Sequence, residues 1–165
     1  MTEFAQQLVN ALALGGTYAL LALGLAIVFS VLGLINFAHG ELMTIAGYAV
    51  FFLLATNLPF PVVFVLAMVV SGLAAMAMER IAFRPVRGAN GTTLLITSFA
   101  VALILQLALQ NLIADRPQAL VIPTWLNGTI NVGPVTIGRV QLMSMIAAVI
   151  AVVALTLLLR STTLG

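Results

Sequence analysis

The sequence predicts an all-α, polytopic transmembrane helix bundle with about five spans. Of the 165 residues, 63% are hydrophobic and only 6% are charged, which leaves too little polar surface to cover the core of an ordinary soluble domain. Long apolar stretches recur along the whole chain, separated by shorter polar connections. We therefore expect residues 1–165 to form a single transmembrane domain.

Five apolar stretches lie near the length of about 17 to 25 residues that a membrane-spanning helix needs. They run from about Leu8 to Ile35, Leu42 to Leu58, Val62 to Met78, Thr93 to Ile113 and Val140 to Leu159. At about 1.5 Å per residue, the first is on the order of 40 Å long and the second about 25 Å, against a hydrocarbon core of about 30 Å. This mismatch predicts that the polar segment between them lies near or inside the membrane edge. The first stretch lacks the basic start of a cleavable signal peptide, so we expect it to be retained.

That polar segment, Asn36–Glu41, is the main candidate site. Polar groups are costly in hydrocarbon, so they mark a solute path, a partner or a solvated break in a helix. A re-entrant break and a simple interfacial turn both remain open. We expect Asn36 and His39 to hydrogen-bond backbone groups freed at a break, with Gly40 beside them. Glu41 is expected in the first turn of the second helix, where a carboxylate complements the helix dipole.

The same residues argue against metal binding and catalysis. His39 and Glu41 alone are too few ligands for a closed zinc site. No nucleophile, base and orienting group can be assembled from a chain with a single histidine and no cysteine or lysine. We therefore predict no metal site, no catalytic residue and no enzymatic activity.

Two connections, both expected on the outer face of the membrane, differ in length and composition. Asn57–Pro61 is a short turn containing two prolines that cannot donate backbone hydrogen bonds. The longer connection, residues 114–138, contains two short β-prone segments around Gly133-Pro134, which predict a small β-hairpin. Trp125 in this connection is either an interfacial anchor or a docking residue for an outside partner.

Arginine placement predicts the orientation of the chain. With five crossings, four arginines fall on one side and two on the other: Arg80, Arg84, Arg87 and Arg160 against Arg116 and Arg139. The larger group favours the cytoplasmic face, which places the N-terminus outside and the C-terminus inside. The net charge of +2 is too small and scattered for a nucleic-acid surface.

The segment Glu79–Arg87 is the candidate contact region on the cytoplasmic face. It contains Glu79, Arg80, Arg84 and Arg87. Such a basic cluster acts as a topology anchor that meets lipid phosphates, or it contacts a cytoplasmic subunit.

Small and amide side chains inside the apolar stretches have two possible roles. Gly15-Gly16-Thr17 lets helices approach closely or borders a translocation path. Gln106 and Gln110, one turn apart, either line a passage or tie helices together. A further small-residue stripe, expected to serve helix packing, consists of Ala67, Ser71 and Ala75.

Four strings of residues resemble the LivH-type permeases of branched-chain amino acid ABC importers. The similarity runs through Gly16–Leu20, Gly33–Met43, Glu79–Arg87 and Leu159–Gly165. Asn-Phe-Ala-His-Gly and Glu-Arg-x-Ala-x-Arg-Pro-x-Arg are its most specific parts. The chain looks like the N-terminal part of such a permease, and the family's cytoplasmic loop that engages the ATPase resembles a continuation beyond the last residues.

The resemblance implies a multi-pass inner-membrane subunit of a prokaryotic importer. Its expected partners are a second permease subunit, cytoplasmic ATPase subunits, an extracytoplasmic substrate-binding protein and membrane lipid. The chain has no phosphate-binding loop of the Walker type, so ATP and Mg²⁺ are expected to be used by the ATPase partners and no cofactor by this chain. Transport of urea or short amides, a passive channel and a non-transporting truncated fragment stay open as alternatives.

Overall fold

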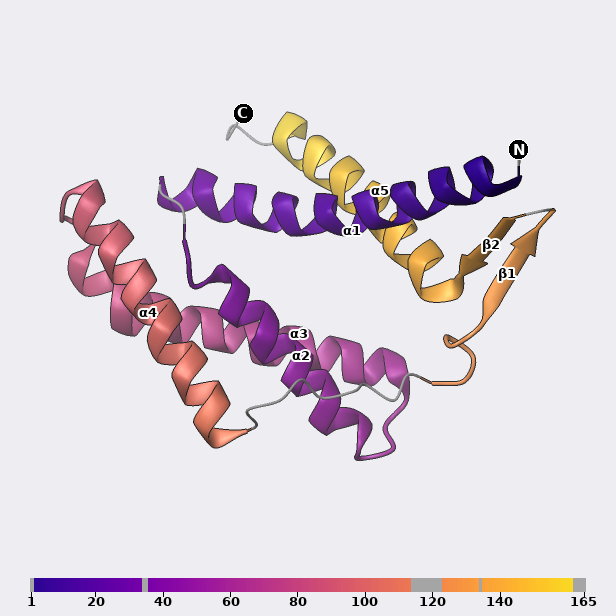
Figure 1. Cartoon of the computed structure of the whole chain (residues 1–165). Coiled ribbons are helices and arrows are strands. Elements are labelled where there is room, and N and C mark those ends of the chain that lie inside the picture. Colours follow the sequence, from indigo (N-terminus) through magenta and orange to yellow (C-terminus); the bar gives the residue numbers. More distant parts are fainter. Residues whose placement is uncertain (1, 34–35, 114–122, 134, 162–165) are drawn as a thin grey trace. The chain divides into compact units, whose positions relative to one another are not determined.

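Apolar helices make up most of the structure, a computed structural model that describes residues 2–33, 36–113, 123–133 and 135–161. Figure 1 shows the elements in chain order: α1 (Thr2–Leu32), α2 (His39–Leu54), α3 (Phe60–Met78), the π-helical turn η1 (Glu79–Phe83), the 3₁₀ turn η2 (Arg84–Val86), α4 (Gly91–Leu112), β1 (Thr129–Val132), β2 (Val135–Gly138) and α5 (Arg139–Ser161). They form two compact units, Met1–Ile27 with Ile122–Gly165, and Val28–Val121. The single-domain interpretation stays a prediction.

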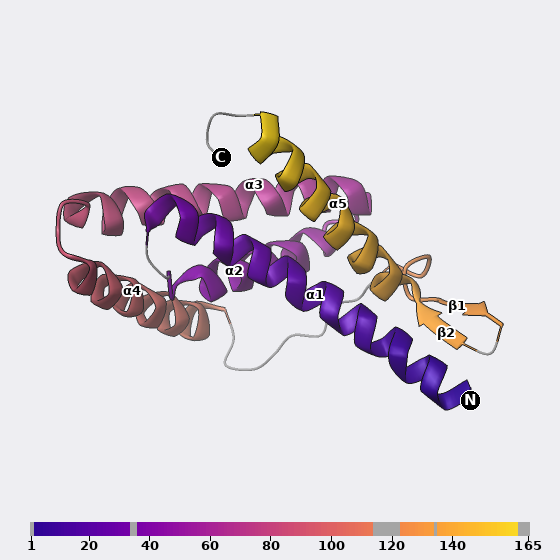
Figure 2. The same cartoon turned by 90° about the horizontal axis from the view of Figure 1, so that it is seen from above.

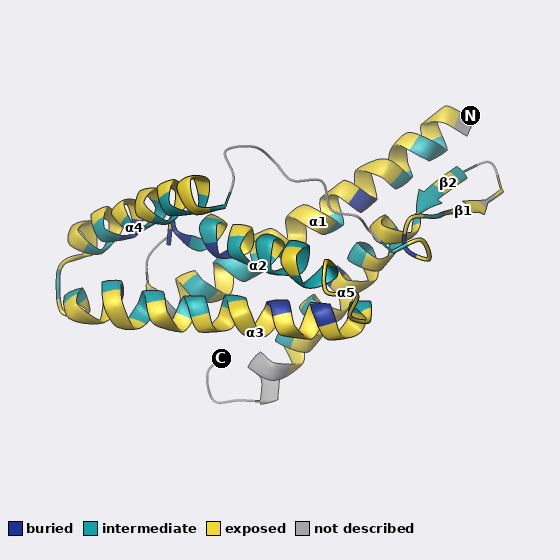
Figure 3. Ribbon diagram, turned by 90° about the horizontal axis from the view of Figure 1, so that it is seen from below, coloured by how far each residue is buried: buried dark blue, intermediate teal, exposed yellow. Residues whose placement is uncertain are grey.

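The predicted all-helical membrane fold with a small hairpin is confirmed. Within the described residues, four helical segments are long and apolar enough to cross a membrane: Glu3–Ser30, Phe60–Val86, Gly91–Leu112 and Arg139–Leu157. The fifth apolar helix, α2, has 16 residues and is about 24 Å long, shorter than a hydrocarbon core of about 30 Å. Exposed residues dominate the long helices in Figure 3, as expected where lipid rather than water meets the surface.

In the unit Val28–Val121, α2 lies against α3 (Figure 1 and Figure 2). Small side chains permit this approach, because Ala67 on α3 is buried and Ser71 is half-buried. The Ser71 hydroxyl donates a hydrogen bond of 3.2 Å to the carbonyl oxygen of Leu42 in the first turn of α2. The predicted packing role of this stripe therefore fits the contacts of Ala67 and Ser71.

The π-helical turn after α3 changes the geometry of the chain before α4. The backbone N–H of Arg84 donates to the carbonyl of Glu79, five residues earlier. Phe83 is only 4% exposed, which anchors the turn inside its unit. Pro85 stands in the first turn of η2, where its missing N–H is not needed.

In the other unit, α1 and α5 meet through small residues. Ala13 and Ala148 are buried. At Gly16, an added Cβ would lie 3.4 Å from the Met145 Cγ and 3.5 Å from its Cα. A Cβ at this position would therefore be in van der Waals contact with Met145, and a side chain longer than alanine needs further room.

The hairpin of this unit is bonded to the start of α1. Its antiparallel register pairs Thr129 with Gly138 and Val132 with Val135. The Gln6 side chain adds to this pairing, because its Nε2 donates to the Thr136 carbonyl and its Oε1 accepts from the Thr136 N–H, both at 2.8 Å. A single amide side chain thus supplies the partners that a neighbouring strand would supply.

Replacing Gly16 by leucine is expected to lower the free energy of unfolding by about 1–3 kcal/mol, because its Cβ already reaches van der Waals contact with Met145 and the atoms beyond it need further room. Denaturation in detergent, followed by circular dichroism, measures the loss. Gly15→Leu is the matched control, since it changes helix propensity equally but its Cβ meets nothing within 4 Å. Equal losses in the two variants would contradict the packing.

Candidate functional site

The candidate site begins where α1 stops. Gly33 has a φ of +70°, and its N–H closes the last turn on the Phe29 carbonyl at 2.8 Å. This left-handed glycine is a common way for a helix to end. The chain starts a new helix at His39, so the two apolar helices are separated by a true break in helical structure.

Asn36 organises the start of the second helix. Its side chain is only 3% exposed, and its Oδ1 accepts a hydrogen bond of 3.0 Å from the N–H of Ala38. Its carbonyl accepts a further bond of 3.1 Å from the His39 N–H. Because Ala38, the residue preceding α2, has no side-chain acceptor of its own, Asn36 replaces a conventional cap. The expectation that Asn36 bonds freed backbone agrees with this geometry.

His39 behaves differently from this expectation. Its Nδ1 atom is buried and has no hydrogen-bond partner among the described residues, although the residue as a whole is half-buried. The expected bond to freed backbone is therefore not made through this nitrogen. A buried polar atom without a partner costs about 1–3 kcal/mol, so this nitrogen is a costly feature among the described residues.

Gly40 and Glu41 complete the first turn of α2. Gly40 is exposed, and Glu41 is half-buried. Glu41 lies in the first helical turn, as expected. Its carboxylate there complements the positive end of the helix dipole.

The break is held against α4 by an aromatic contact that the sequence did not reveal. The rings of Phe37 and Phe99 meet edge to face, with centroids 6.1 Å apart and planes at 87°. Ser98, next to Phe99, is completely buried and donates to the Leu95 carbonyl at 2.8 Å. A lone serine in the apolar run of α4 was the only signal that this part of the helix is buried.

The two glutamines on α4 lie away from this contact. Gln106 is eight residues, or about 12 Å, beyond Ser98 along the helix. Gln106 and Gln110 are both exposed, and neither makes a hydrogen bond within the described part of the chain. Their neighbour Asn111 instead donates to the Leu107 carbonyl at 2.7 Å.

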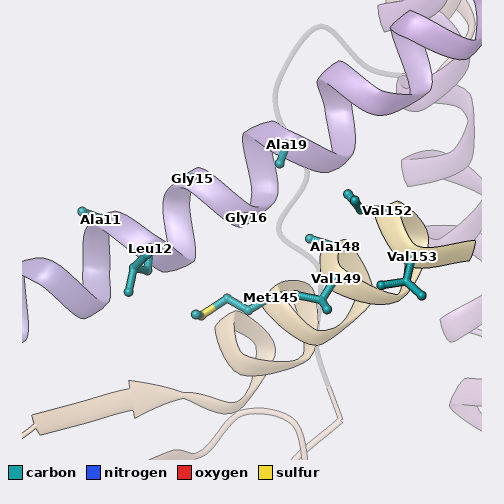
Figure 4. A pocket seen from close by; sticks show the side chains of 10 residues that line it. All are labelled: Ala11, Leu12, Gly15, Gly16, Ala19, Met145, Ala148, Val149, Val152 and Val153. Atoms are coloured by element: carbon teal, nitrogen blue, oxygen red, sulfur yellow. The ribbon is translucent and has the colours of Figure 1, made fainter. Parts of the chain in front are cut away.

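Thr17 belongs to the unit that contains α1 and α5. Thr17 is exposed, and its hydroxyl donates a hydrogen bond of 3.2 Å to the Ala13 carbonyl. Beside it, a groove of about 460 Å³ separates parts of α1 and α5, and Figure 4 shows the side chains that line it. The groove is lined by Ala11, Leu12, Gly15, Gly16, Ala19, Met145, Ala148, Val149, Val152 and Val153. These side chains are small or apolar, so the groove contains no polar side chain that could bind a solute.

A second groove, of about 410 Å³, lies between α2 and α3. Apart from the hydroxyl of Ser71, its lining side chains are apolar or absent. Its lining residues are Ala46, Gly47, Val50, Phe64, Ala67, Met68 and Ser71. This groove therefore offers a single polar side chain, whereas the break in the same unit contains an amide, an imidazole and a carboxylate.

The arginine-rich candidate segment follows α3. Glu79 and Arg87 form an ion pair through Oε1 and Nη2. Arg80 and Arg84 are exposed and make no ion pair or hydrogen bond with the residues described. No group of three or more potential metal-ligating His, Cys, Asp or Glu side chains is found among the described residues.

Comparison with known proteins identifies the family. Residues 7–165 match the family described as "Branched-chain amino acid transport system / permease component". The chain belongs to this family. It is a family of membrane transport components and not of catalytic enzymes, so the chain is a multi-pass transport permease component.

Curated relatives agree with this assignment. The chain is 31% identical to the high-affinity branched-chain amino acid transport system permease protein BraD of Pseudomonas aeruginosa, over 99% of this chain and 57% of the relative. It is 32% identical to the corresponding permease protein LivH of Escherichia coli K12, over 98% of this chain and 56% of the relative. The chain thus spans a little over half the length of these relatives. No solved structure matches it.

Replacing Asn36 by alanine is expected to lower the free energy of unfolding by about 1–3 kcal/mol, because the buried N–H of Ala38 loses its acceptor. Denaturation in detergent measures the loss, and faster amide hydrogen exchange at Ala38 locates it. Asn127→Ala removes the same atoms from an exposed residue and serves as the control. An Asn36 variant as stable as the Asn127 variant would show that the break does not depend on this bond.

Proposed function

We propose that this chain is part of the membrane-spanning permease of an ABC importer that moves branched-chain amino acids. The family match over residues 7–165 supports this proposal, and so do the transport functions for which the permease proteins BraD and LivH are named. The chain lacks a nucleotide phosphate-binding loop of the Walker type. ATP is therefore hydrolysed by partner subunits, with Mg²⁺, and the permease changes conformation in response.

Within this chain, Asn36–Glu41 borders the translocation path. The segment joins the connection after α1 to the first turn of α2. It contributes a buried amide, an imidazole and a carboxylate between two apolar helices. Irregular backbone at membrane depth occurs where it is buried in protein or lines a watery cavity. The Nδ1 of His39 has no hydrogen-bond partner among the described residues, and a passing solute or water would form a hydrogen bond with it. Thr17, Gln106 and Gln110 are further candidates for the path.

The assembly we propose lies in the inner membrane of a prokaryote. It combines two permease subunits with cytoplasmic ATPase subunits and an extracytoplasmic substrate-binding protein. With five crossings, the arginine distribution favours an N-terminus outside and Glu79–Arg87 on the cytoplasmic face. In this orientation the β1–β2 hairpin lies on the outer face, where the binding protein delivers the substrate.

His39→Ala and Glu41→Ala are expected to reduce leucine uptake by about fivefold each, the effect of losing an interaction of about 1 kcal/mol. Uptake of radiolabelled leucine is measured in cells that contain the permease, its ATPase and its binding protein, at matched expression. Trp125→Ala is expected to reduce uptake less than either variant, because its 49% exposed side chain lies in the outer connection and not at the break. Unchanged uptake in both the His39 and Glu41 variants would remove the break from the path.

Liposomes test the dependence on ATP. Vesicles with the permease alone are expected to take up no leucine, since a binding protein and ATP hydrolysis drive the proposed import. Addition of the ATPase, the binding protein and internal ATP should start uptake, and leucine should compete with isoleucine and valine but not with urea. Uptake by the permease alone would identify a passive channel, and competition by urea or acetamide would identify an amide carrier.

A further inference from the structure

The segment after α3 contains two arginines whose charge is not compensated by the described residues. Glu79 is paired with Arg87, eight residues later, across the π-helical and 3₁₀ turns. This pair is exposed, with side-chain accessibilities of 38% and 70%, so it contributes little stability. Its main consequence is electrostatic, because it occupies the one carboxylate of the segment and leaves Arg80 and Arg84 cationic.

Arg80 and Arg84 are four residues apart across the π-helical turn, a spacing that favours a shared face. Arg80 lies inside η1 and Arg84 directly ends it. Helical residues four positions apart lie on the same face. The turn itself is held by the buried ring of Phe83 and by the bond from the Arg84 N–H to the Glu79 carbonyl. Two guanidinium groups are thus presented together from a backbone that is anchored on its other side.

The neighbouring side chains indicate how deep Arg80 and Arg84 lie in the membrane. Ile81 is 76% exposed beside Arg80, and Met76 and Leu73 on the preceding helix are 60% and 56% exposed. In a membrane protein, such side chains face acyl chains. Arginine stems extend along apolar surface and bring the guanidinium to the level of the lipid head groups. The exposed Ile81 between the two cationic positions fits the acyl side of this boundary.

We propose that Arg80 and Arg84 form a binding site for the phosphate of an anionic phospholipid such as phosphatidylglycerol. Guanidinium groups match phosphate oxygens with two parallel hydrogen bonds each. An anionic head group is preferred over a zwitterionic one because the latter adds a cationic amine that the arginines repel. The site does not depend on the proposed transport function, since it requires only that this end of α3 reach a membrane surface.

Native mass spectrometry of the detergent-solubilised full chain tests the site. Phosphatidylglycerol or phosphatidylcholine is added at equal concentration, and bound lipid is counted. Phosphatidylglycerol is expected to bind preferentially, and each arginine removed in Arg80→Gln and Arg84→Gln is expected to weaken that binding about fivefold. Arg80→Lys with Arg84→Lys keeps both charges and should retain most of the preference.

Arg116→Gln is the control of equal charge change. If phosphatidylglycerol binding falls as much in this control as in Arg80→Gln, the loss is caused by net charge alone and the proposal is wrong. Displacement of the lipid by an equal concentration of inorganic phosphate would show a free-anion site instead of a lipid site, with the same consequence. Circular dichroism checks folding, and the single variants decide the matter if the double variant does not fold.

A protein partner is the competing outcome. If the double glutamine variant keeps its preference for phosphatidylglycerol but no longer co-purifies with the ATPase subunits, the arginines face a protein and the proposal is wrong. If lipid binding falls while co-purification persists, the lipid site is supported. Neither result changes the interpretation of leucine uptake, which tests the transport function separately.

Discussion

A helix that stops within an apolar protein must satisfy its own backbone, because lipid offers no hydrogen-bond partners. This constraint acts between α1 and α2, and the structure meets it with Asn36. The buried amide accepts from the Ala38 N–H, while the Asn36 carbonyl accepts from the His39 N–H. With these bonds the chain can leave one helix and start another within a few residues. The position of Glu41, and with it the polar face of the break, follows from where α2 begins.

Two contacts then fix α2 in its unit. The Ser71 hydroxyl of α3 bonds the Leu42 carbonyl, and the ring of Phe37 meets Phe99 on α4. A polar group that takes part in solute passage has to be held in a defined position. These contacts hold Phe37 within the break and Leu42 directly after it. The Nδ1 of His39 is buried without a hydrogen-bond partner among the described residues, in contrast to the Asn36 side chain.

Elsewhere, polar interactions are concentrated at the connections between helices. Gln6 bonds both backbone groups of Thr136 in the hairpin, Arg139 donates to the Trp125 carbonyl at 2.6 Å, and Glu79 pairs with Arg87. The helices themselves meet through alanine, glycine and serine. This division follows from the environment, because side-chain charge is tolerated at the membrane boundary and small residues provide close packing within it.

Composition and apolar length predicted the helical membrane fold and the short second helix, and local residue patterns predicted the hairpin around Gly133 and the placement of Glu41 in a first helical turn. These features are local, since each depends on a run of residues and its turn signals. The pairing of Phe37 with Phe99, the Gln6 clamp on Thr136 and the π-helical turn at Glu79 appeared only with the tertiary structure. The first two join residues far apart in sequence, and the third depends on how α3 packs against its neighbours. No local sequence pattern encodes such contacts. Sequence therefore determined which residues are polar at the break, whereas tertiary packing decided that Asn36 is satisfied and that the Nδ1 of His39 is not.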